Sequence, residues 1–84
     1  MILAWTEEAW QDYLHWQKVD KKILKRINTL IKDTKRHPFE GLGNPEPLKH
    51  NWTGYWSRRI NLEHRFVYKP TQETLYIAQC RYHY

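Results

Sequence analysis

The sequence predicts an α+β fold in which two N-terminal helices pack on a mainly antiparallel β-sheet. Two segments with apolar residues at helical spacing lie in the first half of the chain, one after Thr6 and one at residues 21–36. Three strand-like segments follow from residue 55, and their short connections allow only antiparallel hairpins. A length of 84 residues leaves room for one core, so residues 1–84 are expected to form a single domain.

The N-terminal half begins with a short apolar run at residues 2–5 that is typical of a strand. Thr6 and Asp20 are placed to cap the two helices that follow. The His37-Pro38 pair predicts the end of the second helix, because the residue before a proline avoids helical geometry. The apolar stripe of this helix consists of Ile23, Leu24, Ile27, Leu30 and Ile31.

The C-terminal half begins with a Gly- and Pro-rich loop, with a short strand expected near Leu48. The strands are expected at residues 55–60, 65–69 and 74–84. Alternation along the last of them would place His83 and Tyr84 on opposite faces of the sheet. We therefore expect that the end of the chain must twist or leave the sheet if both side chains serve one site.

The formal net charge is +5, and 13 of the 14 lysines and arginines follow Asp20. This asymmetry predicts a basic surface for a polyanion, with nucleic acid as the first candidate. A solvated basic surface without a partner is the alternative. The polar face of the helix at residues 21–36 carries Lys21, Lys22, Lys25, Arg26, Lys32, Lys35 and Arg36.

Several classes of protein are not indicated by the residue pattern. The single cysteine, Cys80, is expected to be a small buried strand residue, since one cysteine cannot form an internal disulfide. Histidines and acids lack the spacing typical of a metal site, so we expect no metal or cofactor. The first residues resemble neither a signal peptide nor a membrane span, which predicts a cytoplasmic protein.

The second half of the chain concentrates side chains that can act on a phosphodiester. Cleavage of RNA without a metal needs a base for the 2′-hydroxyl, an acid for the leaving 5′-oxygen, and cations for the charge of the transition state. The candidates are Glu46, Lys49, His50, Arg58, Arg59, Glu63, His64, Arg65, Arg81, His83 and Tyr84. Composition alone does not show that these side chains lie close together in space.

Four blocks, "NPEPLKHN", "YWSRRI", "EHRFVY" and "CRYHY", closely resemble the YoeB toxins within the RelE-like family of bacterial toxin–antitoxin ribonucleases. The resemblance extends over nearly the whole chain, including "WTEEAWQDYLHWQ". It implies a microbial-RNase-like fold and cleavage of messenger RNA in the ribosomal A site. It also implies inhibition by a cognate YefM-like antitoxin and assembly into a homodimer.

Residue by residue, the resemblance implies that Glu46 is the general base and His83 the general acid. Arg65 would be the main ligand of the phosphate in the transition state. Tyr84 matches the terminal tyrosine that helps to position substrate in the family. Further phosphate or substrate contacts are expected from Lys49, His50, Arg59 and Arg81.

Two other functions are compatible with the same residues. The chain could be a non-catalytic module that binds RNA through its basic face and stacks bases on its aromatic rings. It could also be a decayed toxin that acts only by binding its antitoxin. One departure from the family lies at Leu42 and Asn44, where relatives can carry lysines, so this loop is expected to attract RNA less strongly.

Overall fold

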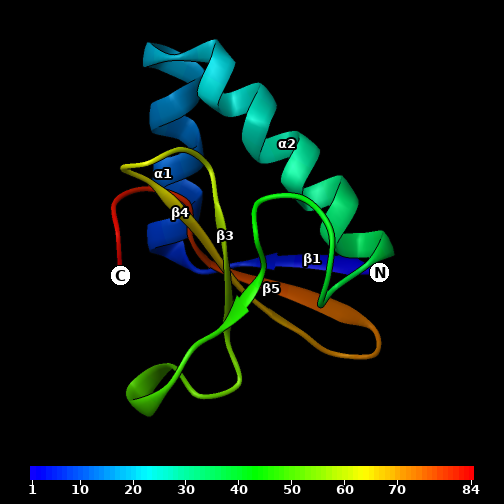
Figure 1. The fold of residues 1–84 in the computed structure, drawn as a ribbon. Coiled ribbons are helices and arrows are strands. Elements are labelled where there is room, and N and C mark those ends of the chain that lie inside the picture. Colours follow the sequence, from blue (N-terminus) through cyan, green and yellow to red (C-terminus); the bar gives the residue numbers. More distant parts are fainter.

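The computed structural model describes all 84 residues and consists of two layers (Figure 1). One layer contains helices α1 (Glu7–Val19) and α2 (Lys21–Arg36), and the other is a five-stranded sheet. The strands are β1 (Ile2–Trp5), β2 (Glu46–Pro47), β3 (Trp56–Arg59), β4 (Arg65–Pro70) and β5 (Thr74–Gln79), with one 3₁₀ turn, η1 (His50–Trp52). The predicted fold class is therefore confirmed.

Both helices begin after the predicted caps, and α2 ends where the sequence predicts. The Thr6 hydroxyl accepts the Ala9 N–H at 3.1 Å, and the Asp20 carboxylate accepts the Lys22 and Ile23 N–H groups at 3.1 and 3.2 Å. Each cap satisfies amides that have no partner within the helix. Helix α2 ends at Arg36, one residue before His37-Pro38. Neither helix is long and apolar enough to cross a membrane.

The strand order of the sheet is β1-β5-β4-β3-β2. The three pairings from β5 to β2 are antiparallel, as their short connections require. Strand β1 runs parallel to β5, with Ile2 opposite Thr74. No local pattern predicts this pairing, because it joins the two ends of the chain.

The helices cover one face of the sheet and enclose the core between the layers (Figure 1). Cys80 is fully buried, as predicted, and this burial raises the pKa of its thiol. The thiol is therefore protonated and unreactive at neutral pH. The core consists of Ala9, Trp16, Ile27, Leu30, Ile31, Ile60, Phe66, Tyr68, Leu75, Ile77 and Cys80.

The last strand is shorter than predicted. Strand β5 ends at Gln79, so the expected strand at residues 74–84 is wrong for its final five positions. The backbone N–H of Cys80 donates to the Asp12 carboxylate at 3.1 Å, and its carbonyl accepts the Trp16 indole N–H at 2.8 Å. These groups thus pair with α1 rather than with a neighbouring strand. Tyr82 then turns the chain with φ of +64°.

Two isoleucines on adjacent strands test how strongly the core stabilises the fold. Ile77 is fully buried, whereas Ile2 is 65% exposed. We expect Ile77→Ala to lower the free energy of unfolding by about 2–5 kcal/mol, because it removes buried methyl groups and leaves a cavity. The same change at Ile2 should stay within about 0.5 kcal/mol. Urea unfolding of both variants measures the difference, and equal losses would contradict the assigned core.

Candidate active site

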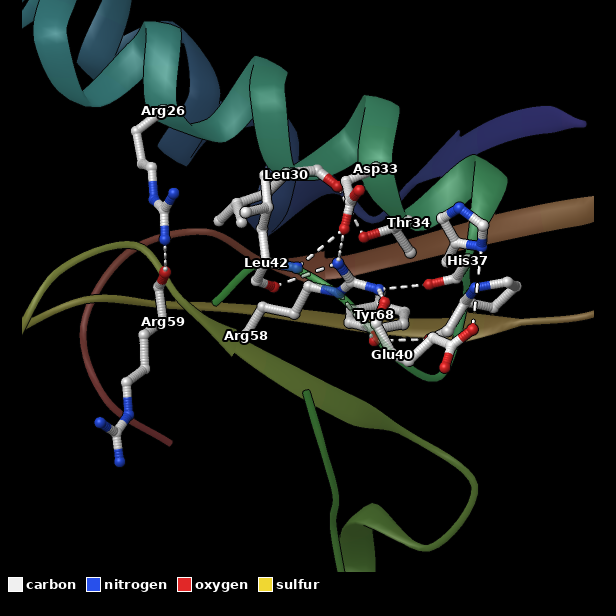
Figure 2. A network of polar contacts seen from close by, with 11 residues as sticks. Arg26, Leu30, Asp33, Thr34, His37, Glu40, Leu42, Arg58, Arg59 and Tyr68 are labelled. Atoms are coloured by element: carbon white, nitrogen blue, oxygen red, sulfur yellow. Dashed lines mark hydrogen bonds and ion pairs between the residues drawn. The ribbon is translucent and has the colours of Figure 1, made fainter. Parts of the chain in front are cut away.

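The two faces of β3 and β4 have different roles. Arg58 is fully buried on the helix side, while Arg59 is exposed on the opposite side. Figure 2 shows Arg58 directed toward α2 and Arg59 directed away from it. We call the face of the sheet that points away from the helices the outer face. It carries the side chains that alternate with Arg58, beginning with Ser57 and Arg59.

The register of the sheet brings candidate residues together on the outer face. Glu46 is directly opposite Ser57, and Arg59 is directly opposite Arg65. Directly opposed side chains lie on the same face, so the carboxylate and the two guanidinium groups share it. Like charges at opposed positions repel each other, and a bound phosphate would remove that repulsion.

Arg58 holds the loop that leads from α2 to Glu46 (Figure 2). Its Nη1 donates to the Asp33 carboxylate at 2.6 Å and to the Leu42 carbonyl at 3.1 Å. Its Nη2 donates to the carbonyls of His37 and Glu40. Its Nε donates to the Tyr68 hydroxyl at 3.1 Å. All five guanidinium N–H groups thus have acceptors, which makes burial of the charge tolerable.

Asp33 completes this network from α2. Its Oδ2 accepts the Leu42 N–H at 2.9 Å as well as the Arg58 guanidinium. These two contacts hold the pKa of Asp33 below its ordinary value, with the Leu42 N–H as the larger cause. Gly41 has φ of +110°, and a Cβ there would lie 2.3 Å from Asp33 Oδ2. Only glycine therefore fits at this position.

The carboxylate of Glu46 is oriented by its own loop. The amide of Asn44 donates to Glu46 Oε1 at 3.0 Å, and Asn44 adopts φ of +54°, a conformation that asparagine tolerates better than most residues. The Gly43 carbonyl accepts the Arg59 N–H at 2.7 Å and joins this loop to the end of β3. The sequence predicts only a weaker attraction of RNA at Asn44, and not its hydrogen bond to Glu46.

A groove of about 440 Å³ is lined mainly by residues 47–52, which follow Glu46 in the chain. It brings together three of the predicted site residues, Lys49, His50 and Tyr84. His50 has φ of +58°, and its carbonyl accepts both the N–H and the hydroxyl of Thr53, which fixes the turn. The remaining lining residues are Pro47, Leu48, Asn51 and Trp52.

The last two residues leave the sheet, and Tyr84 returns to its outer face. The hydroxyl of Tyr84 lies 3.5 Å from Ser57 Oγ, and Ser57 is the residue opposite Glu46. The His83 and Tyr84 rings are 4.7 Å apart. The end of the chain therefore does leave the strand, as a shared site requires.

His83 and Arg81 line a second groove, of about 460 Å³, between the chain end and α1. The acids Glu8 and Asp12 lie in the same groove. The Arg81 guanidinium is 4.5 Å from the centre of the Tyr82 ring. Arg81 and His83 are thus grouped with acids of α1 rather than with Lys49, and the phosphate contact of Arg81 and the acid role of His83 stay predictions.

Arg65 begins β4 and is half-buried. Its Nη1 contacts the carbonyls of Asn61, Leu62 and His64 at 2.7 to 3.2 Å. Its Nε and Nη2 have no hydrogen-bond acceptor within the protein. The guanidinium is therefore anchored on one side, and its other nitrogens can bind an anion.

Comparison with known proteins identifies the family. Residues 5–84 match the family described as YoeB-like toxin of bacterial type II toxin-antitoxin system. The chain belongs to this family. It is 66% identical to Toxin YoeB of Escherichia coli strain K12 over 84 residues, the full length of both chains.

Two solved structures are similar over the whole chain. The YoeB/ParE toxin from Agrobacterium tumefaciens has a TM-score of 0.96 and 52% identity, with all of both chains covered. YoeB from Staphylococcus aureus, solved as a dimer, has a TM-score of 0.94 and 47% identity, with 100% of this chain and 98% of that chain covered. A YoeB–YefM complex from S. aureus has a TM-score of 0.93 and 46% identity, with 100% of this chain and 98% of that chain covered. The resemblance predicted from the sequence is confirmed.

The Asp33–Arg58 ion pair makes stability dependent on pH. Because the pKa of Asp33 is lowered in the folded state, its stabilising contribution is present above the ordinary value of 3.8 and is lost as the pH falls through the folded value. We expect Asp33→Asn to lower the free energy of unfolding by about 3 kcal/mol at pH 7, since Arg58 loses its counter-charge. This difference from the wild type should shrink toward pH 3.

Urea unfolding between pH 7 and pH 3 measures that difference. Glu73→Gln is the control, because the Glu73 side chain is exposed and makes no hydrogen bond or ion pair. Its difference from the wild type should stay small and nearly constant with pH. A difference for Asp33→Asn that does not decrease on acidification would contradict the charge-dependent role.

Proposed function

We propose that this toxin is an endoribonuclease that cleaves messenger RNA in the ribosomal A site. Its side chains would catalyse the reaction without a metal ion. The observation that supports this proposal best is the opposed pair Arg59 and Arg65 on the outer face, with Glu46 and Tyr84 next to them at Ser57. This arrangement offers positive charge for a phosphate beside a carboxylate. The resemblance of the sequence to ribonuclease toxins supports the same conclusion.

In the proposed reaction, Glu46 removes the proton of the ribose 2′-hydroxyl. The 2′-oxygen attacks phosphorus, the bond from phosphorus to the 5′-oxygen breaks, and His83 gives a proton to that oxygen. Arg65, with Arg59 and Lys49, stabilises the added negative charge of the transition state. The upstream fragment is left with a 2′,3′-cyclic phosphate and the downstream fragment with a 5′-hydroxyl.

The two histidines of the basic half have different places in this scheme. His50 lines the groove with Lys49 and Tyr84 and would contact substrate. His83 lies beside the Tyr84 ring and is the acid. A role for Arg81 in substrate binding would require RNA to reach the groove beside α1. The proposal therefore rests more on Lys49 than on Arg81.

The proposed partners are the ribosome, an antitoxin and a second copy of the chain, all in the cytoplasm. The basic face of α2 exposes Lys21, Lys22, Lys25, Lys32, Lys35 and Arg36, and would contact ribosomal RNA. YoeB structures from S. aureus include a dimer and a YoeB–YefM complex, which supports a homodimer and a YefM-like antitoxin here. Such an antitoxin would be an acidic segment that folds over the basic site.

Replacing the proposed acid tests catalysis against mere binding. We expect His83→Ala to slow cleavage by about 10²–10⁴-fold, the usual contribution of a general acid, while RNA affinity stays within a factor of a few. Cleavage sites and product ends should be mapped in a translation extract. The matched control is His37→Ala. The His37 imidazole is 56% exposed on the loop after α2 and is not part of the proposed site.

Four results would contradict this assignment. Full cleavage by His83→Ala would remove the proposed acid. Products with only 3′-hydroxyl ends would exclude attack by the 2′-hydroxyl. A wild-type protein that binds RNA but never cuts it would favour the RNA-binding module, and one that binds only antitoxin would favour the decayed toxin.

Antitoxin binding should weaken as salt increases. The screening length falls from about 10 Å at 0.1 M salt to about 3 Å at 1 M, so attraction between an acidic segment and this basic chain is reduced. Calorimetry of the complex at increasing salt measures the effect. An affinity that does not change with salt would indicate that apolar contacts dominate instead.

A further inference from the structure

We propose that His64 is a positioning residue that holds the end of the chain, and with it His83 and Tyr84, in a fixed position. The catalytic part of this inference rests on the proposed function. The structural part does not, because it concerns one hydrogen bond between His64 and Tyr82.

The His64 ring is fixed on several sides. Its side chain is 9% exposed, and its ring centre lies 4.8 Å from the Trp16 ring at an interplanar angle of 71°. The His64 N–H donates to the Asn61 side chain at 2.8 Å, which fixes the turn before β4. On the solvent side, Glu63 places a carboxylate oxygen 3.8 Å from Nε2. The imidazole therefore has little freedom to rotate.

This fixed ring accepts a hydrogen bond from the chain end. The Tyr82 N–H donates to His64 Nδ1 at 2.7 Å. The Tyr82 carbonyl accepts the Arg65 N–H at 2.9 Å and the Gln79 side-chain amide at 3.2 Å. Two successive residues, His64 and Arg65, thus bind both backbone polar groups of Tyr82. Acceptance at Nδ1 requires that this nitrogen carries no proton, so the imidazole hydrogen is on Nε2.

The hydrogen bond from Tyr82 to His64 stabilises a strained backbone conformation. Tyr82 has φ of +64°, a conformation that is strained for a residue other than glycine and persists only where the surroundings enforce it. Without an acceptor at His64, the Tyr82 N–H would lose the partner that favours this conformation. The next two residues are His83 and Tyr84, so a change at Tyr82 redirects both.

The same contacts link the chain end to the proposed phosphate ligand. The backbone N–H of Arg65 donates to the Tyr82 carbonyl, and the Arg65 guanidinium lies on the outer face. The distance between His83 and the phosphate held by Arg65 would therefore depend on this attachment. Because a misplacement of about 1 Å can reduce a rate by about 10²-fold, the attachment bears directly on catalysis.

An isosteric pair of variants tests the proposal. Asparagine and leucine have the same branching, but only asparagine places an acceptor near the position of the histidine Nδ1. We expect His64→Leu to accelerate hydrogen exchange at the Tyr82 amide by at least about tenfold, while amides in the centre of β4 and β5 keep their wild-type rates. In His64→Asn, exchange at Tyr82 should stay within a few-fold of the wild type. This measurement uses the free toxin and needs no activity.

Cleavage provides the second measurement. We expect kcat for RNA cleavage to fall by about 10–100-fold in His64→Leu with KM nearly unchanged, and His64→Asn to restore most of the loss. Equal losses in the two variants would overturn the proposal. They would show that the packing of the ring matters and that the hydrogen-bond acceptor at Nδ1 does not. Slow Tyr82 exchange in His64→Leu would also overturn it. If the wild type does not cleave RNA, only the proposed function fails.

A third measurement needs no variant and covers the case in which neither substitution folds. Nitrogen-15 chemical shifts of the wild-type imidazole should identify Nδ1 of His64 as unprotonated and Nε2 as protonated. A proton on Nδ1 would be incompatible with acceptance from the Tyr82 N–H. That result would overturn the proposal regardless of the variants.

Discussion

The outer face depends on the burial of one positive charge on the opposite side of the sheet. Arg58 is fully buried, and a buried guanidinium is tolerated only when its charge and all its N–H groups are paired. The structure meets this condition with the Asp33 carboxylate, the Tyr68 hydroxyl and three carbonyls of residues 37–42. The loop is thereby fixed in a single path and delivers Glu46 to the edge of the sheet.

This arrangement separates the tasks of the two faces. The helix side contains the apolar core and the Arg58 network, and it supplies stability. The outer face has no helical layer, so its charged side chains stay accessible. Alternation along β3 connects the two tasks directly, because Arg58 and Arg59 are consecutive residues with opposite directions. A change that moved β3 by one residue would place both charges on the wrong faces.

The end of the chain completes the outer face by a different principle. Residues 80–84 make no strand pairing and are held by separate contacts from Asp12, Trp16 and His64. Those contacts replace a regular ladder of backbone hydrogen bonds and allow the positive φ at Tyr82. The site therefore combines a rigid part, built on β2 to β4, with a part whose position depends on a few side-chain contacts.

The sequence by itself determined the helices, their caps and the antiparallel hairpins, because these features depend on neighbours a few positions apart. Alternation also placed Arg58 and Arg59 on opposite faces. Only the tertiary structure decided the burial of Arg58, the parallel pairing of β1 with β5, and the path of the chain after Gln79. Each depends on groups distant in the chain, such as Trp16 and Cys80, which are 64 positions apart. Local patterns carry no information about which distant acceptor satisfies a given donor.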